Sequence, residues 1–426
     1  MRKSEIELRR EFHTYPESGW TEFRTTARII EELEALGLPV QYGPSLHVPE
    51  KMFGLPDPDK LQACYERALQ ESDRPELIEA MKGGFTGCLT RIEGALPGPL
   101  LGIRVDIDCN DVTEAADEKH RPYREGFSST HPGCMHACGH DAHTAIGIGL
   151  ARRLVALRDQ LRGTVLLVFQ PGEEGLRGAA SMTAAGLFSG CDYFIGGHIG
   201  LKNYPFGTVA VSSTGILSST KLDVFYQGKP AHAGASPQLG RNAMAAAATA
   251  VLNLLAIPRH SDGASRINIG TLEAGSGRNV IPASARMTIE TRGATPEINE
   301  YMEASANRVI QAAAQMYECE YSTQYMGGAN SVECDKDLAE WIGQLIAPLS
   351  GVGTVMQDFP FGGGEDVTTM MRDVKEHGGK VTEMAFPFPL IAPHHNNYFD
   401  IDENVIDLAI RVYTEIALHI ADFEGK

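Results

Sequence analysis

Long hydrophobic runs are missing from this sequence. No stretch of the 426 residues is apolar for long enough to span a bilayer, and the N-terminal segment runs into an amphipathic helix without a signal-peptide core. The eight cysteines lack the spacing of a disulfide framework, a pattern typical of reduced thiols. We therefore predict a cytoplasmic protein that does not bind membranes.

An excess of positive charge is missing too. The formal net charge of −18 argues against nucleic acid and anionic lipid as partners. Proline and glycine are spread along the chain and the apolar content is ordinary, which excludes disorder as the main state. No internal repeat is evident. The length exceeds that at which single hydrophobic cores stop growing, so we expect two domains.

Short apolar runs alternate with helical patterns in the first half of the chain. Residues 100–106, 164–170 and 192–198 have the near-continuous apolar character of strands buried on both faces, and helical patterns occupy 142–158 and 177–187. This alternation predicts an α/β domain with a mostly parallel sheet. Ligands of such sheets bind outside the carboxyl ends of the strands.

The N-terminal segment predicts one helix over residues 3–37, interrupted at residues 15–19. His13 and Glu17 could serve a site, but surface polar residues beside a turn are the commoner case. The proline-bounded segment 45–85 predicts an insertion over one edge rather than a core element.

A second pattern occupies residues 213–326. Its predicted elements follow the order β-α-β-β-α-β of a small ferredoxin-like sandwich, at residues 220–228, 242–257, 265–272, 285–292, 296–318 and 319–326. The α/β pattern resumes afterwards, with a helix opened by the turn at 362–366 and a final helix at 403–422. We therefore predict a catalytic domain of residues 1–212 and 327–426, interrupted by an inserted domain of residues 213–326.

The segment Met135–Thr144 contains one thiol and three imidazoles. In an extended backbone Cys138 and His140 would point to the same side, and Gly139 between them permits a tight turn. A thiolate with a neutral imidazole suits zinc, manganese or cobalt. Asp141 is placed to accept the second imidazole N–H. The alternative is a buried thiol followed by helix-capping residues.

Further candidate ligands follow the other strands. The pair Glu173 and Glu174 comes directly after one buried strand, His198 ends the next, and His394 and His395 precede the last helix. In a two-metal hydrolase one glutamate of such a pair is a ligand and the other is the general base. For an isolated Glu-Glu pair a solvated turn would be the commoner explanation.

Together these segments resemble the amidohydrolase branch of the aminoacylase/carboxypeptidase metallopeptidases. That branch includes hippurate hydrolases and indole-acetyl-amino-acid hydrolases, and the likeness covers nearly the whole chain. The segments that carry it are 135–144, 170–175, His198, 228–234 and 394–400. The resemblance implies a dinuclear-metal catalytic domain, an inserted lid and dimerisation domain, and metal-dependent hydrolysis of linear amides.

The resemblance assigns roles by position. Glu173 would be the general base, and two divalent ions, manganese or zinc, would be held by Cys138, His140, Glu174, His198 and His395. We prefer His395 to His394 because its spacing to Phe399 fits the family. Where the wider family has His-x-Asp, this chain has Arg104-Val105-Asp106, so Asp106 is either an outer-shell residue or a buried partner of Arg104.

In the inserted domain, His232 resembles a histidine that reaches across a dimer interface and stabilises the oxyanion in the neighbouring site. A surface histidine in a turn is the alternative. Asn279 and Arg292 resemble substrate-binding positions, with Arg278 as a further donor, and arginine can hold a carboxylate through two parallel hydrogen bonds. The alternative for Arg292 is an exposed strand end.

The expected substrate is a small N-acyl amino acid. The insertion at 45–85 and the loop at 275–280 resemble members acting on p-aminobenzoyl-glutamate, a product of folate breakdown. The alternatives are a general aromatic-acyl amidohydrolase of the hippurate or indole-acetyl type, a non-catalytic paralogous subunit, and a protein with one structural zinc. We expect a homodimer or a hetero-oligomer with a paralogous subunit.

Overall fold

The computed structural model describes residues 2–424, and its chain divides into two compact units. The first unit is formed by Met1–Thr214, Val332–Gly362 and Asp366–Lys426. The second is formed by Gly215–Ser331 with Gly363–Glu365. Each unit has a hydrophobic core of its own, so each is described separately.

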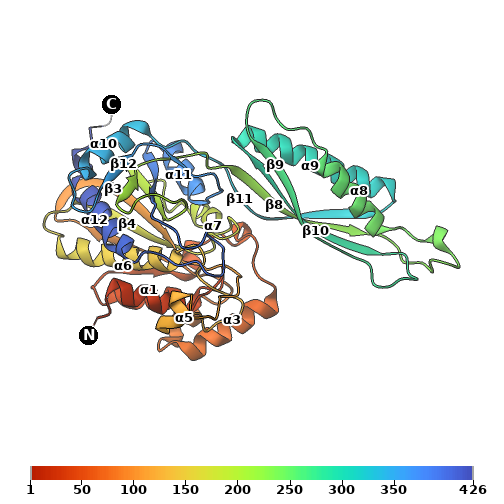
Figure 1. The fold of residues 1–426 in the computed structure, drawn as a ribbon, viewed down its shortest axis with the longest axis horizontal. Coiled ribbons are helices and arrows are strands. Elements are labelled where there is room, and N and C mark those ends of the chain that lie inside the picture. The colour runs from red at the N-terminus through yellow and green to blue at the C-terminus, as the bar shows by residue number, and fades with distance from the viewer. Residues whose placement is uncertain (1, 425–426) are drawn as a thin grey trace. The chain divides into compact units, whose positions relative to one another are not determined.

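The first unit is built on a mixed eight-stranded sheet (Figure 1). Its four central strands β4, β3, β5 and β14 run parallel, as predicted, while β1 and β2 on one side and β6 on the other join antiparallel. Edge strand β12 pairs parallel to β6. In spatial order the strands are β1 (Val40–Tyr42), β2 (Cys88–Glu93), β4 (Arg162–Gln170), β3 (Leu96–Asp106), β5 (Tyr193–Ile199), β14 (Lys380–Phe386), β6 (Thr208–Ala210) and β12 (Thr354–Met356). A two-stranded parallel ribbon joins β7 (Ser213–Thr214) to β13 (Phe359–Pro360).

Helices cover both faces of this sheet. Successive side chains of a strand point to opposite faces. Accordingly Val165, Leu167 and Phe169 of β4 pack in the core that includes α1, α2, α6, α10 and α12, whereas Leu166 and Val168 pack with α7 and α11. The helices are α1 (Glu5–Thr14), α2 (Phe23–Glu34), α3 (Pro58–Glu71), α4 (Pro75–Ala80), α5 (Arg121–Glu125), α6 (His140–Ala156), α7 (Ala179–Ala184), α10 (Lys336–Ile346), α11 (Val367–Glu376) and α12 (Asn404–His419). Among residues 2–424, no helix combines the length and apolarity needed to cross a membrane.

Two expectations for the N-terminal region are wrong. His13 and Glu17 are not surface residues: both side chains are fully buried. Glu17 accepts the backbone N–H groups of Arg24 and Thr25 at the start of α2, where free amides need acceptors. The insertion at 45–85 is not confined to an edge, because Ala68 of α3 and neighbouring apolar residues of α4 lie in the main core.

The second unit is a four-stranded antiparallel sheet in the order β11-β8-β10-β9 (Figure 1). Its elements follow one another as β8 (Ser218–Gln227), α8 (Ala243–Leu255), β9 (Ser265–Ala274), β10 (Ser284–Gly293), α9 (Pro296–Met316) and β11 (Glu320–Ala329). Four alanines of α8, among them Ala246 and Ala250, are fully buried against the sheet and α9. Their small side chains allow the helix to pack closely.

Candidate metal centre

The predicted ligands meet at one edge of the first sheet. Asp106 ends β3, Glu173 and Glu174 follow β4, and His198 lies near the end of β5. Strand β3 pairs in parallel with both β4 and β5, so the carboxyl ends of the three strands lie side by side. This is the edge at which α/β sheets bind ligands.

Cys138 and His140 reach this edge through a tight turn at Gly139. Gly139 has φ +90° and lies at the N-cap of α6, so the extended backbone that we expected between the two residues is wrong. A Cβ atom at position 139 would lie 2.9 Å from Ile199 Cδ1 and in a strained backbone conformation. The turn brings ligand atoms of Cys138, His140 and His198 within 4.8 Å of one another.

Backbone carbonyls fix the orientation of both imidazoles. His140 Nδ1 lies 3.0 Å from the carbonyl oxygen of Asp108, and His198 Nδ1 lies 2.7 Å from that of Ile199. A carbonyl only accepts, so Nδ1 carries the hydrogen and Nε2 offers a lone pair in the neutral ring. His198 Nε2 lies 3.4 Å from Cys138 Sγ, and the buried His140 Nε2 has no hydrogen-bond partner among the described residues. Two imidazole lone pairs beside a thiol fit a divalent cation.

A second group of candidate ligands adjoins the first. Ligand atoms of Cys138, Glu174 and His395 lie within 4.8 Å of one another, as do those of His140, Glu173 and Glu174. His395 Nε2 is 3.3 Å from Glu174 Oε1. By contrast, His394 Nε2 accepts the backbone N–H of Leu201 at 3.4 Å. The geometry therefore groups His395 with Cys138 and Glu174, whereas the ring of His394 lies 5.5 Å from that of His198 and accepts a backbone N–H.

Neighbouring charges shift the pKa values of His140 and Glu174 in opposite directions. Burial lowers the pKa of His140, but the carboxylates of Asp106 and Asp108 outweigh it and raise that pKa to about 10. Burial raises the pKa of Glu174, but His395 and His140 outweigh it and lower that pKa to about 2. A cation that binds His140 must therefore displace a proton, while Glu174 is already ionised.

Asp106 and His143 form a supporting pair. Asp106 Oδ1 accepts from His143 Nδ1 at 2.5 Å, and Oδ2 accepts from Arg104 Nη1 at 2.7 Å. The other ring nitrogen of His143 accepts the backbone N–H of Ile199 at 3.0 Å. Both nitrogens of His143 are therefore engaged, and the ring orients the strand next to His198. Asp106 is a buried partner of Arg104 and of this orienting histidine.

We expected Asp141 to accept an N–H from His140, and this expectation is wrong. Its Oδ2 lies 2.8 Å from both Arg9 Nε and His13 Nδ1, and all three side chains are fully buried. The second N–H of His140 is directed at the Asp108 carbonyl instead. No local pattern indicates this arrangement, because Arg9 and His13 are about 130 residues away along the chain.

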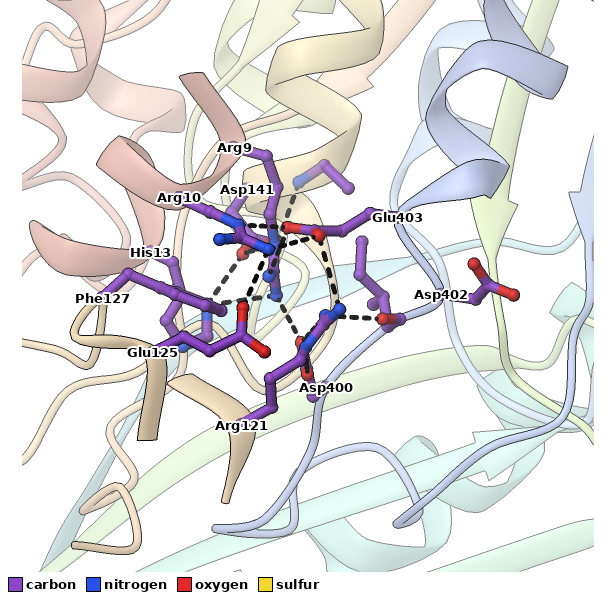
Figure 2. A network of polar contacts seen from close by, with 12 residues as sticks. Arg9, Arg10, His13, Arg121, Glu125, Phe127, Asp141, Asp400, Asp402 and Glu403 are labelled. Carbon is purple, nitrogen blue, oxygen red and sulfur yellow. Dashed lines mark hydrogen bonds and ion pairs between the residues drawn. The ribbon is translucent and has the colours of Figure 1, made fainter. Parts of the chain in front are cut away.

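Arg9 connects Asp141 to acidic residues in the C-terminal part of the chain (Figure 2). Its guanidinium pairs with Asp400 at 2.9 Å and with Glu403 at 3.4 Å, and Arg121 pairs with Asp400 at 2.5 Å. Asp400 lies five residues after His395 and Asp141 lies next to His140. The network therefore connects α1 with two segments that carry candidate ligands.

The inserted unit places His232 and Asn279 together. The segment around His232 pairs with that around Val280, and Ala233 N–H donates to the Asn279 carbonyl at 2.9 Å. His232 is exposed, and its Nδ1 accepts the backbone N–H groups of Gly234 and Ala235 at 3.1 and 3.0 Å. In the neutral ring the hydrogen is therefore on Nε2, which is a donor. The exposed Arg278 precedes Asn279.

Arg292 is not brought together with these residues. It lies at the end of β10, whose first residue, Ser284, follows the loop that contains Asn279. Arg292 lies eight positions after Ser284, a distance of about 26 Å along the strand. Arg292 instead forms a two-pronged ion pair with Glu290, with Nε–Oε2 at 2.9 Å and Nη2–Oε1 at 3.1 Å.

Comparisons with known proteins show the family of this chain. The model of "Peptidase family M20/M25/M40" matches residues 102–419. The chain is 45% identical over 413 residues to one of the subunits of p-aminobenzoyl-glutamate hydrolase from Escherichia coli (strain K12), with 96% of this chain and 94% of that protein covered. It is 43% identical over 412 residues to indole-3-acetyl-aspartic acid hydrolase of Enterobacter agglomerans, with the same coverage.

A solved structure gives the same result. The aminobenzoyl-glutamate utilization protein of Klebsiella pneumoniae superposes with a TM-score of 0.83 at 37% identity, covering 97% of this chain and 95% of that one. The chain therefore belongs to peptidase family M20/M25/M40. The prediction of a metal-dependent amidohydrolase, made from the sequence motifs, is confirmed.

The Arg9 network yields a stability prediction. Replacing Arg9 with alanine would remove the guanidinium that the buried Asp141 and Asp400 share, leaving them with the side chains of His13 and Arg121 as partners. We therefore expect Arg9→Ala to lower the free energy of unfolding by about 3–5 kcal/mol. Urea unfolding would measure the change. Arg74→Ala is the matched control: Arg74 pairs with Glu34 and Glu76 at the surface, and its loss should cost less than about 1 kcal/mol. Equal effects of the two substitutions would contradict the assigned importance of the network.

Proposed function

We propose that this chain hydrolyses the amide bond of p-aminobenzoyl-glutamate, releasing p-aminobenzoate and glutamate. The observation that carries the proposal is the meeting of a thiol, imidazoles and two adjacent carboxylates at one sheet edge. We propose as ligands of two divalent ions, manganese or zinc, the residues Cys138, His140, Glu174, His198 and His395. The mixed sulfur, nitrogen and oxygen donors support such ions rather than magnesium or calcium.

In this proposal Glu173 moves the proton. Divalent ions bound at this site supply Lewis acidity toward the acyl carbonyl and lower the pKa of water. Glu173, buried beside His140 and Glu174, takes a proton from the attacking water. It then delivers that proton to the amide nitrogen, because an amine leaves far more readily than an amide anion. The buried setting excludes bulk water as a competing proton source.

The inserted unit is proposed to be a ferredoxin-like lid and dimerisation domain, with His232 acting in a neighbouring protomer's site. The Nε2–H of His232 is a fixed donor suited to a developing oxyanion. The distance of about 26 Å along β10 supports action in trans. Within one protomer, Arg292 lies too far from His232 and Asn279 for one small substrate to contact all three.

A partner chain is proposed because a relative is named as a subunit. The Escherichia coli relative is named as one subunit of its enzyme, which describes part of a larger assembly. We propose that this chain also pairs with a second chain, either a copy of itself or a paralogue. We further propose a cytoplasmic location, which the eight free cysteines support.

Arginine side chains are proposed to donate hydrogen bonds to the carboxylates of the substrate. Arg292 of one protomer, together with Arg278 and Asn279 of the neighbouring protomer, is proposed to hold the glutamate half of the substrate. The guanidinium of Arg292 is already paired with Glu290, so a substrate carboxylate would have to compete with or join that pair. The second candidate activity is hydrolysis of indole-acetyl-aspartate, because a relative with that name is 43% identical. Both substrates join an aromatic acyl group to an acidic amino acid.

The first prediction separates the base from the ligands. Glu173→Gln should lower kcat by at least about 100-fold while the metal content per chain stays unchanged, because a base is lost and no ligand is. Cys138→Ala should instead lower the metal content, because the thiolate is a ligand. Metal analysis beside turnover measurements checks both. A Glu173→Gln enzyme with substantial activity, or a Cys138→Ala enzyme with full metal content, would contradict the assignments.

The second prediction tests action in trans. His232→Ala should lose activity but keep its metal. When it is mixed with Glu173→Gln and the protomers exchange, activity should return, because one site of each mixed dimer has both residues. If labelled protomers exchange and no activity appears, His232 acts within its own protomer or not at all.

The third prediction concerns the substrate. The kcat/KM for p-aminobenzoyl-glutamate should exceed that for p-aminobenzoyl-alanine and for hippurate by at least about 100-fold, because substrates without the side-chain carboxylate cannot form the hydrogen-bonded ion pair with the proposed arginine donors. Indole-acetyl-aspartate, measured in parallel, tests the second candidate. Equal values for the alanine and glutamate compounds would make the enzyme a general aromatic-acyl amidohydrolase.

A further inference from the structure

The side chains of the adjacent Glu173 and Glu174 lie close together, which an extended backbone would not allow. Consecutive residues of an extended chain point to opposite sides. Yet ligand atoms of Glu173, Glu174 and His140 all lie within 4.8 Å of one another. The backbone after β4 must therefore bend sharply, and something must hold it in the bent form.

The bend is a tight turn in a costly conformation. Gly172 has φ +62°, Gly175 has φ +92°, and Leu176, which is not a glycine, has φ +59°. Within the turn, Leu176 N–H donates to the Glu173 carbonyl at 2.6 Å, and Gly178 N–H donates to that of Gly172 at 2.9 Å. Non-glycine residues rarely adopt such angles, so surrounding contacts must stabilise the turn.

Two buried carboxylates provide those contacts. The backbone N–H of Glu173 donates to Asp108 Oδ1 at 3.0 Å, and that of Glu174 donates to Asp108 Oδ2 at 2.9 Å. One residue earlier, the N–H of Gly172 donates to Glu22 Oε1 at 2.7 Å. Three successive amides form a concavity of the kind that binds anions, and side chains from distant segments occupy it.

We propose that Asp108 is a positioning residue for the reaction, holding the peptide between Glu173 and Glu174 so that one carboxylate faces the ions and the other the scissile bond. The inference rests on the proposed function. Because its two oxygens accept from successive amides, Asp108 fixes the planes of the peptides on both sides of Glu173 and hence the directions of the two glutamate side chains. Its own carbonyl also orients His140.

This arrangement costs stability. Glu22 and Asp108 are both fully buried acids. Burial and the neighbouring Asp108 together raise the pKa of Glu22 to about 8. Two acids buried together cannot both ionise without a large cost, so their presence here is better explained by the geometry that they impose than by a gain in stability.

The test is Asp108→Asn, which replaces one of the two accepting oxygens with an NH2 group. We expect kcat to fall by about 10- to 100-fold with KM within about threefold, the usual effect of losing an outer-shell partner. The chelator concentration that strips half of the metal should fall by about tenfold. The matched control is Asp111→Asn in the same segment, because the exposed Asp111 pairs with Lys60 and accepts from Cys134, and neither of these is a candidate ligand. It should behave as wild type.

A comparison of amide and ester substrates separates positioning from loss of folded protein. In the ester analogue an oxygen replaces the scissile N–H, and the leaving alkoxide depends less on a proton from Glu173. Asp108→Asn should therefore slow the amide at least about fivefold more than the ester. Equal slowing of both substrates, or wild-type rates with both, would overturn the inference.

A second variant tests the inference if Asp108→Asn folds poorly. Glu22→Gln weakens the support one residue earlier and should give the same preference for the ester, with a smaller loss of kcat; an unchanged amide-to-ester ratio would count against the inference. If the wild-type enzyme cleaves no N-acyl amino acid, the proposed function fails, while the chelator measurement still tests Asp108. Wild-type chelator sensitivity in Asp108→Asn would then overturn the inference.

Discussion

The first unit depends on one buried guanidinium, that of Arg9. Taking a charge out of water is costly unless it is paired and hydrogen-bonded, so the position of Arg9 dictates the positions of its partners. Those partners are Asp141 at the start of α6 and the pair Asp400 and Glu403 before α12 (Figure 2). Each partner lies close in sequence to a candidate ligand. The position of α1 therefore helps to fix, through these ion pairs, the positions of the segments that carry the candidate ligands.

Carboxylates have two kinds of role around this site, and their surroundings distinguish them. Asp106, Asp108 and Asp141 are fully buried and accept hydrogen bonds from groups that do not move, namely backbone amides, histidine rings and arginines. They orient other residues. Glu173 and Glu174 lie next to the imidazole of His140, where a cation or a proton can reach them. The orienting acids outnumber the reacting ones, as is common where a site must be held rigid.

That the candidate ligands would meet was predictable from residue type, from position at a strand end and from the family resemblance. The first two signals are local: Cys138 and His140 share a short motif, and Glu173 and His198 follow buried strands. Asp108 was missed although it repeats the pattern of Asp106 two residues later, because its partners are backbone amides, which leave no trace in a sequence. The burial of His13 and Glu17 was also missed, because polar residues beside a turn have the same local pattern whether they are exposed or paired in the interior. Asp141 was assigned the wrong partner since Arg9 and His13 reach it only through the tertiary fold. The separation of Arg292 from Asn279 follows from the length of β10, which local likeness does not convey.

The partners of Arg9 also set an order on biosynthesis. Asp141 is made early, but Asp400 and Glu403 leave the ribosome roughly 260 residues later, after the whole inserted unit. At typical translation rates this interval lasts about 13 to 50 s. During it the nascent N-terminal segment holds a guanidinium with only part of its counter-charge, and the last candidate ligand, His395, does not yet exist. The full set of candidate ligands therefore exists only at the end of synthesis, when the C-terminal segment completes the ion-pair network.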